Sequence, residues 1–266
     1  MDKPVGKTPL EALENLRRQE GIPKNVPMTY AGRLDPMASG KLLVLTGEAC
    51  KRKEEYLALE KEYVFEVLFD AQSDTGDVLG LVDTDTPQRH SPLNAAHITS
   101  ILRKLRGTLT LPYPAYSSKT IDGKPLHVWS VEGRLDEIDI PTYTATIHQL
   151  ELLNIGEAPI DALYEHISQK IELVTPVTAE SKKAGNDFRR PAVRAAWKKW
   201  YDNRAQETYP IAQFRCVCSS GMYMRTLANE IAKQVCTTGL AYSIMRTKVG
   251  RYQSLPFGYG VWLKQF

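Results

Sequence analysis

The segment from Thr29 to Gly40 restricts the fold more than any other part of the chain. It reads Thr-Tyr-Ala-Gly-Arg-Leu-Asp-Pro-Met-Ala-Ser-Gly, with Asp35 between two glycines and Pro36 directly after it. Glycine and proline at these positions disfavour a helix, and the apolar run from Leu42 to Leu45 that follows is typical of a buried strand. We therefore expect a loop that carries Asp35 to the start of a buried strand.

The charge of Asp35 leaves two interpretations open. A carboxylate beside an apolar run is either exposed to solvent or held by a cation, because an unpaired buried charge is costly. For an isolated Gly-x-x-Asp-Pro sequence, a solvated turn aspartate is the more frequent outcome. Other parts of the chain have to decide between the two.

Composition sets only broad limits on function. The chain has 266 residues, of which 42% are hydrophobic and 24% are charged, and this suits one large globular domain or two small ones. No apolar run approaches the roughly 18 residues that cross a bilayer, and Met1 is followed by polar residues rather than a signal sequence, so we expect a cytoplasmic protein with no membrane contact. The four cysteines lack zinc-type C-x-x-C spacing, and we expect neither a disulfide nor a metal site.

Caps and apolar spacing predict three helices. The first begins at the N-cap Thr8 and runs to about Glu20, and the second lies within residues 91–106. A third begins near Met222 and ends before Gly239. The core residues expected on the first two helices are Leu10, Leu13, Leu16, Ile98, Ile101, Leu102 and Leu105.

Runs of β-branched and aromatic residues predict the strands. One runs from Tyr63 to Phe69, and others are expected at 115–121, 144–153 and 210–218. Cys216 and Cys218 would share one face of the last strand and fill the core. These periodicities alone indicate an α+β protein.

The sequence Leu-Asp-Pro-x-Ala-x-Gly around Asp35 resembles the catalytic motif of pseudouridine synthases, in the form of the TruB family, the branch that modifies the T loop of tRNA. Six further segments match that branch in the expected order along the chain. They are 2–8, 47–51, 61–63, 114–126, 220–227 and 246–250. The resemblance covers roughly residues 1–154 and 208–252, and it favours a functional Asp35 over a solvated turn.

The resemblance implies the pseudouridine synthase fold, a mixed and largely antiparallel sheet flanked by helices with the active cleft across its middle. It implies a single catalytic domain over residues 1–266, working as a monomer on the T arm of tRNA and isomerising the uridine at position 55 without a cofactor. The reaction breaks the glycosidic bond, turns the base and joins a base carbon to the sugar with no net redox change. A carboxylate can serve it by attacking the nucleotide or by assisting proton removal from the sugar.

The resemblance assigns catalytic roles to Asp35, Tyr63 and Arg225. Asp35 would supply the carboxylate, and Arg225 would hold it with its planar guanidinium. The uridine has to leave its stack before a side chain can reach its sugar. Tyr63 would then stack on the displaced base and take part in the proton transfer.

The resemblance also implies substrate contacts by Tyr223 and Met245, as walls of the pocket. Met245 stands where the family usually has leucine, an exchange that conserves volume. Tyr30 stands where many bacterial relatives carry histidine, and a tyrosine can still stack on or bond to a displaced nucleotide. The cations expected to contact phosphates or the pocket are Arg33, Lys119, Lys3 and Arg246.

Residues 155–207 do not fit the family pattern, and we expect them to form a helical, basic insertion. The stretch 170–204 holds nine basic and four acidic residues, a net charge of +5 against +3 for the whole chain. Its aromatic residues Trp197, Trp200 and Tyr201 would either stack on RNA or pack against the domain. Relatives commonly carry a C-terminal RNA-binding domain of the PUA type, whereas 16 residues follow Gly250 here, so the insertion is a candidate substitute for an absent PUA domain.

Two other functions fit parts of the pattern. A synthase for ribosomal RNA would share the sequence Gly-Arg-Leu-Asp, but the opening Asp2-Lys3-Pro4 and the pair Asp35-Pro36 favour the tRNA branch. A non-catalytic RNA-binding or RNA-folding protein on the same scaffold would not need Asp35, Tyr63 and Arg225 together.

Overall fold

A computed structural model describes residues 1–85, 92–174, 189–203, 207–255 and 259–266. Within these residues, one eight-stranded sheet has the order β1-β3-β11-β5-β10-β9-β6, with β12 paired to β11. The strands are β1 (Asp2–Lys3), β3 (Ala38–Lys41), β5 (Glu60–Phe69), β6 (Gly107–Pro112), β9 (Thr142–Pro159), β10 (Thr208–Cys218), β11 (Gly239–Ser254) and β12 (Gly260–Gln265). Neighbours are antiparallel except β3 and β11, which are parallel, so the expected mixed, largely antiparallel sheet is confirmed.

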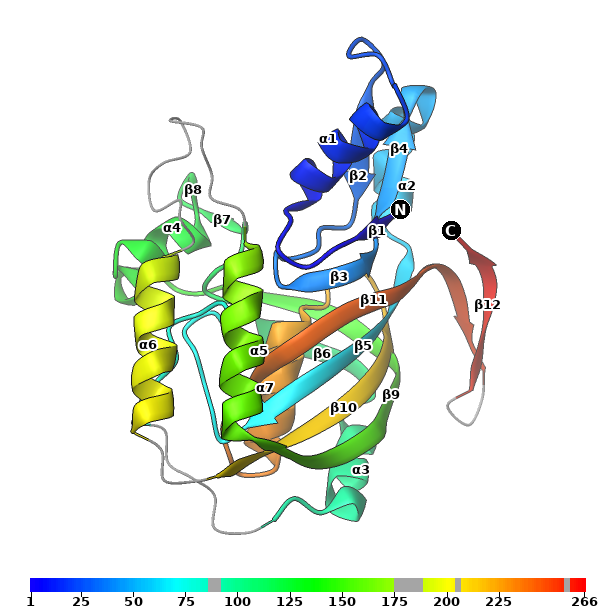
Figure 1. Ribbon diagram of the computed structural model, residues 1–266. Coiled ribbons are helices and arrows are strands. Elements are labelled where there is room, and N and C mark those ends of the chain that lie inside the picture. The colour runs from blue at the N-terminus through cyan, green and yellow to red at the C-terminus, as the bar shows by residue number, and fades with distance from the viewer. Residues whose placement is uncertain (86–91, 175–188, 204–206, 256–258) are drawn as a thin grey trace.

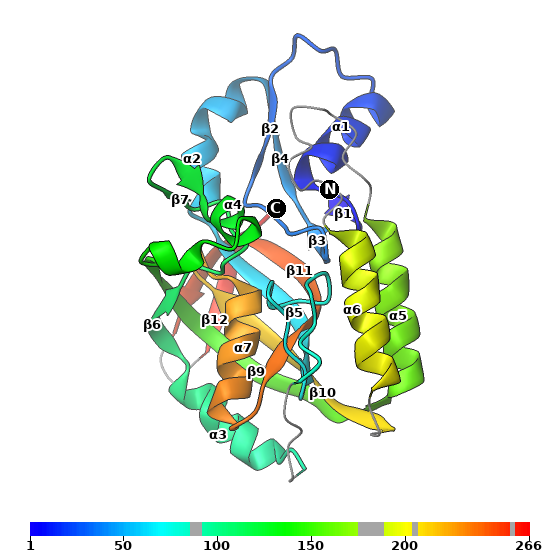
Figure 2. The same ribbon diagram turned by 90° about the vertical axis from the view of Figure 1, so that its left-hand side faces the viewer.

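Four helices lie against this sheet. They are α3 (Ala95–Lys104), α5 (Ile160–Leu173), α6 (Arg190–Asp202) and α7 (Met224–Gln234). Figure 2 shows α7, α5 and α6 on the same side of the sheet, whereas β12 lies behind it. The four apolar residues expected to bury the second predicted helix, Ile98 to Leu105, are all buried in the structure, although that helix begins after the N-cap Asn94.

The middle of the sheet is the centre of the core. Phe65 on β5 and Phe214 on β10 are fully buried and stack with their ring centroids 5.4 Å apart. Cys216 and Cys218 are buried on the same face of β10, as the alternation of a strand requires. Their predicted role in packing is thus confirmed.

The N-terminal part forms a small layer above the main sheet (Figure 1). It contains α1 (Pro9–Gln19), the hairpin of β2 (Met28–Ala31) and β4 (Leu43–Thr46), the 3-10 helix η1 (Gly47–Arg52) and α2 (Lys53–Leu57). Thr8 caps α1 together with Glu11 in a capping box, as predicted. Leu10 is nevertheless 45% exposed, so its assignment to the core is wrong: α1 buries Ala12 and Leu13 against this narrow hairpin layer, and its opposite side stays in solvent.

The predicted strand at 115–121 is also wrong. Only β7 (Thr120–Ile121) and β8 (Lys124–Pro125) pair there, followed by α4 (Leu126–Val131) and the 3-10 helix η2 (Leu135–Glu137). The preceding backbone carbonyls bond elsewhere: those of Ser117 and Lys119 accept from the first turn of α4, and that of Ala115 accepts from the Ser130 hydroxyl. A segment whose carbonyls are used in this way cannot join a strand ladder.

The segment expected as an insertion, 155–207, begins as part of the sheet. Strand β9 runs on to Pro159, which pairs with Thr208 at the start of β10. Helices α5 and α6 come between β9 and β10 in the chain, and they lie side by side in Figure 1. Trp197 and Trp200 are fully buried, so of the two interpretations of these tryptophans, packing against the domain is the one that the structure supports. Lys182 and Lys183 lie outside the described residues.

Candidate active site

The loop between β2 and β3 carries Asp35, and glycine shapes both of its ends. Gly32 and Gly40 have φ values of 78° and 97°, a region that favours glycine. At Gly40, a Cβ atom would lie 2.2 Å from the carbonyl oxygen of Arg246 on the parallel strand β11. The loop therefore needs glycine where β3 meets β11, and the amide of Ala38 closes the turn by donating to the Asp35 carbonyl.

Arg225 forms an ion pair with Asp35. The Nε atom of Arg225 lies 2.8 Å from the Oδ2 atom of Asp35, although the two residues are 190 positions apart in the chain. The Arg225 side chain is 5% exposed, whereas that of Asp35 is 41% exposed. The cation is thus fixed within the protein while the carboxylate still faces solvent.

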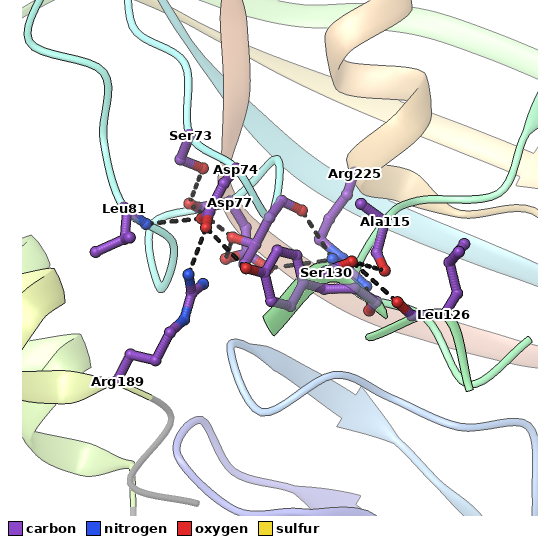
Figure 3. A network of polar contacts seen from close by, with 11 residues as sticks. Ser73, Asp74, Asp77, Leu81, Ala115, Leu126, Ser130, Arg189 and Arg225 are labelled. Atoms are coloured by element: carbon purple, nitrogen blue, oxygen red, sulfur yellow. Dashed lines mark hydrogen bonds and ion pairs between the residues drawn. The ribbon is translucent and has the colours of Figure 1, made fainter. Parts of the chain in front are cut away.

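Three further groups hold the Arg225 guanidinium. Its Nη1 atom donates to the carbonyl of Thr75 at 2.7 Å, and its Nη2 atom donates to the carbonyl of Tyr116 at 3.2 Å. A second carboxylate, that of Asp77, lies 3.6 Å from Nε. Thr75 and Asp77 belong to the loop after β5 and Tyr116 to the loop after β6. Figure 3 labels Asp77 and Arg225 in this network.

Asp77 is a buried acidic residue that the sequence analysis did not single out. Burial raises the pKa of its carboxyl group, and the nearby Arg225 cation acts in the opposite direction. Its Oδ1 atom accepts hydrogen bonds from the Thr75 hydroxyl and the Leu79 amide. The sequence Ser-Asp-Thr-Gly-Asp at 73–77 has the composition of a solvated turn, so only the Arg225 contact reveals its place in the site.

Tyr63 lies in the middle of β5, paired with Cys216 on one side and Arg246 on the other. Its side chain is buried, which raises the pKa of its hydroxyl, and the Arg246 guanidinium beside it acts in the opposite direction. Arg246 in turn donates to the carbonyls of Lys41 and Gly32, on either side of the Asp35 loop. One buried arginine therefore contacts both the Tyr63 hydroxyl and the loop that carries Asp35.

Two of the cations expected to contact phosphates or the pocket, Arg246 and Lys3, are buried, which argues against the phosphate contact. Arg246 is buried, with its guanidinium used by backbone carbonyls. Lys3 is buried as well, and its ammonium donates to the carbonyls of Pro4 and Lys7. Desolvation lowers the pKa of Lys3 to about 8, with the Asp35 charge acting against this shift. Both cations hold N-terminal loops through backbone carbonyls, and contact with the pocket stays a prediction for them.

Tyr223 stands directly before α7 and belongs to a cluster of three tyrosine rings. Its ring lies edge-on to those of Tyr113 and Tyr143, with centroids 5.8 and 5.2 Å away. Burial raises the pKa of Tyr223, and the Asp35 charge acts in the same direction. Tyr223 precedes Arg225 by two positions in the chain. Tyr113 and Tyr143 were not predicted as site residues, because tyrosines in strands usually pack in a core.

The remaining predicted substrate contacts lie in different parts of the fold: Lys119 directly before β7, Tyr30 on β2 and Met245 on β11. Lys119 has its ammonium 5.4 Å from the Tyr113 ring centroid, next to the tyrosine cluster. Tyr30 lies on β2 with the Lys53 ammonium 5.8 Å from its ring centroid. Met245 is 45% exposed on β11, one position after the partner of Phe65. Among the described contacts, none joins Tyr30 or Met245 to Asp35 directly.

The described residues contain neither a candidate metal cluster nor a candidate membrane-spanning helix. No three His, Cys, Asp or Glu side chains gather there as a metal ion would require. Of the helices in the same ranges, none is both long and apolar enough to cross a bilayer.

Residues 22–173 match a family model described as TruB family pseudouridylate synthase (N terminal domain). This match covers more than half of the chain. The chain belongs to this family. The seven motif segments read from the sequence thus identify the TruB family correctly, although three of them, 2–8, 220–227 and 246–250, lie outside the residues matched.

Curated relatives in the TruB family carry the name tRNA pseudouridine synthase B. The one from Caldicellulosiruptor saccharolyticus is 26% identical over 250 residues, covering 94% of this chain and 66% of the relative. The one from Bordetella pertussis is 32% identical over 163 residues, covering 60% of this chain and 65% of the relative. The one from Flavobacterium johnsoniae is 25% identical over 256 residues, covering 95% and 87%. The chain thus spans about two thirds of the length of the first two relatives.

Solved structures share the fold of this TruB family member. A chain of the crystal structure of a Cbf5-Nop10-Gar1 complex superposes with a TM-score of 0.52 at 16% identity, over 94% of this chain and 47% of that chain. A chain of the structure of an H/ACA RNP bound to a substrate RNA containing 2'-deoxyuridine gives a TM-score of 0.50 at 15% identity, over 93% and 45%. At these identities the likeness shows the fold alone.

Proposed function

We propose that this protein is a tRNA pseudouridine synthase that isomerises the uridine at position 55 in the T loop. The observation that carries the proposal is the Asp35–Arg225 ion pair, in which a buried arginine holds a carboxylate that remains open to solvent. Family membership and the names of the relatives support the same substrate class. A protein that only binds RNA has no use for a carboxylate fixed in this way.

In the proposed reaction Asp35 acts as an anion. Arg225 lies against the Oδ2 atom and leaves the rest of the carboxylate able to meet the sugar. Asp35 either attacks the nucleotide or assists removal of a sugar proton, which is later returned, while the C1'–N1 bond breaks; the base then turns, a C1'–C5 bond forms, the proton on C5 is released and N1 takes up a proton. The carboxylate is regenerated at the end. Because the isomerisation involves no net redox change, the proposed reaction needs no cofactor.

The displaced uridine would lie between aromatic and apolar side chains. We assign Tyr63 to stacking and proton transfer, and Tyr223 and Met245 to the walls of the pocket. Each aromatic face can replace the stacking that the base loses on leaving the RNA. Tyr30, Arg33 and Lys119 are proposed to contact the surrounding nucleotides, with RNA bound as the T arm.

The test is to map pseudouridine after incubating the purified protein with a tRNA transcript and with an isolated T-arm hairpin. Carbodiimide labelling and primer extension should give one stop, at position 55, which disappears in a transcript with cytidine there. Asp35→Asn should abolish the product, by at least about a thousandfold in rate, while the Kd for RNA stays within about threefold, because affinity comes mostly from phosphate contacts. Modification at other positions only, or an active Asp35→Asn protein, would contradict the proposal.

A further inference from the structure

We propose that helix α6 braces the active site, with Arg189 as a positioning residue for the Asp35–Arg225 pair. The inference rests on the proposed function, since it concerns the geometry of the same carboxylate. It concerns a part of the chain beyond the residues 22–173 that match the family model. Figure 2 shows the segment after β5 passing between α7, which carries Arg225, and α6.

The segment 73–79 is the element through which α6 would act. It supplies two of the groups that hold the Arg225 guanidinium, the Thr75 carbonyl and the Asp77 carboxylate. On the other side it joins the main sheet, because the Ala241 amide of β11 donates to the Gly76 carbonyl at 2.9 Å. Any displacement of this segment therefore changes the position of Arg225.

Helix α6 contacts this segment at two points. The indole Nε1 atom of Trp197, a fully buried residue, donates to the Val78 carbonyl at 3.0 Å. At the N-terminal end of the helix, the Nη1 atom of Arg189 lies 2.5 Å from the Oδ2 atom of Asp74. The two contacts lie on either side of Thr75 and Asp77 in the sequence.

Arg189 also reaches the second loop that holds Arg225. Its guanidinium lies 4.5 Å from the ring centroid of Tyr116, and the Tyr116 hydroxyl donates to the same Asp74 oxygen at 3.0 Å. Burial and the Asp74 charge raise the pKa of Tyr116 to about 12, which keeps the hydroxyl protonated as a donor. The Tyr116 carbonyl is the group that accepts from Arg225 Nη2. Asp74, Tyr116 and Arg189 thus tie the two Arg225-binding loops together. Figure 3 labels Asp74 and Arg189 within this network.

The conformation of Arg189 indicates that these contacts hold it in place. Its φ is 53°, in the left-handed region that residues other than glycine rarely adopt, and its side chain makes no capping hydrogen bond to the helix that follows. A cation at a helix N-terminus also faces the unfavourable end of the helix dipole. Contacts with Asp74 and Tyr116 offset both costs. A basic residue that only faced solvent or contacted RNA would not require this strained backbone.

The decisive experiment compares Arg189→Ala with Arg194→Ala, which removes an exposed ion pair to Glu172 from the same helix. Hydrogen exchange of the peptide that covers 73–82 should quicken in Arg189→Ala only. The single-turnover rate at saturating T-arm RNA should fall about tenfold in Arg189→Ala, as expected for a misplaced catalytic group, while the Kd for RNA stays within twofold. Arg189→Lys, which keeps the charge but not the planar fork, should recover part of the rate.

A double-mutant cycle isolates the contact itself. Asp74→Asn should lower the rate as Arg189→Ala does, and the combined variant should be little slower than either single variant, because both remove the same interaction. A weaker Kd with an unchanged saturated rate would overturn the inference and make Arg189 an RNA contact. Unchanged exchange and rate would overturn it too. If the wild-type protein makes no pseudouridine, hydrogen exchange still decides whether the brace exists, and only the proposed function fails.

Discussion

At the scale of single residues, two buried arginines organise the site in different ways. Arg225 meets the carboxylates of Asp35 and Asp77, whereas the partners of Arg246 among the described residues are backbone carbonyls and the hydroxyl of Tyr63. The first sets the charge of the site, and the second sets the shape of its loop. Substitutions should therefore separate chemistry from folding.

Tyr63→Phe tests the chemistry. It removes one hydroxyl and keeps the ring, so stacking and RNA affinity should persist. We expect the single-turnover rate to fall about a hundredfold, the low end of the range for the loss of a group that takes part in proton transfer. Quenched-flow measurements of product with saturating RNA would check this. A wild-type rate would show that the hydroxyl has no chemical role.

Arg225→Ala tests the ion pair. It leaves Asp35 and the buried Asp77 without their cation, and breaking a buried pair costs about 3 to 5 kcal/mol, although exposure of Asp35 places the expected loss near 3 kcal/mol. Urea unfolding would measure it, and activity should be lost as well. Arg225→Lys should be more stable than Arg225→Ala, because it keeps a charge near Asp77. An alanine variant as stable as the wild type would contradict the pairing.

At the scale of elements, prediction from the sequence succeeded where the signal is local. The capping box at Thr8, the core face of α3 and the Asp35 loop all depend on residues a few positions apart, and the structure has each of them. It failed for the strand at 115–121, where α4 and Arg225, the latter more than 100 positions away, both take backbone carbonyls. The Asp35–Arg225 pairing itself was expected only from the family motif.

The composition of helix α6 likewise does not predict which of its faces is buried. Its basic residues and its tryptophans alternate along one sequence, and charge clustering does not show which face is covered. The contact of Arg189 with Asp74 spans 115 positions, and that of Trp197 with Val78 spans 119. Periodicity carries no information on partners so distant, and so the brace could not be predicted.

Helix α5 should make stability depend on pH. Its Lys170 is buried and donates to the Tyr242 carbonyl at 2.6 Å, and desolvation lowers the pKa of Lys170 from 10.5 to about 8. Between these values the unfolded chain binds a proton that the folded state has released, so the free energy of unfolding rises with pH. Lys170→Met should flatten that rise by about 1.4 kcal/mol per pH unit in urea titrations at pH 8.5, 9 and 9.5.

Two conditions make the Lys170 measurement decisive. The exposed Lys198 of α6 provides the control, and Lys198→Met should leave the wild-type slope unchanged. Lys3 and Lys61 also have pKa values lowered to about 8 by burial, so some rise remains in every variant. Equal slopes in Lys170→Met and the wild type would show that Lys170 stays protonated as readily in the fold as outside it.

At the scale of the whole molecule, the pairing and burial of its basic residues argue against α6 as the main RNA-binding surface. The described bases of the stretch 170–204 are largely occupied: Lys170 is buried, and Arg189, Arg194 and Lys198 form ion pairs with acidic residues. Arg33 lies instead in the loop that carries Asp35, two positions before it, and the Lys119 ammonium lies 5.4 Å from the ring centroid of Tyr113, which contacts Tyr223. RNA should therefore meet the molecule at the site itself.

The salt dependence of RNA binding tests this arrangement. A variant with Arg33→Gln and Lys119→Gln should bind tRNA more weakly, and its slope of log K against log salt should be shallower by about 1.5, because each lost phosphate contact contributes about 0.7 to 0.9. The matched control changes Lys198→Gln and Lys199→Gln on α6 and should leave the slope within error. The opposite result would move the RNA surface to α6.

The distance of 190 positions between Asp35 and Arg225 also has a consequence for biosynthesis. At typical rates of about 5 to 20 residues per second, a ribosome needs roughly 10 to 40 seconds to pass from one to the other. During that time β3 lacks its neighbour β11, and the Asp35 loop lacks both arginines that hold it. A nascent chain therefore has no Asp35–Arg225 pair and no supported Asp35 loop until α7 and β11 have been made. The proposed modification activity should begin only after residue 246 has emerged.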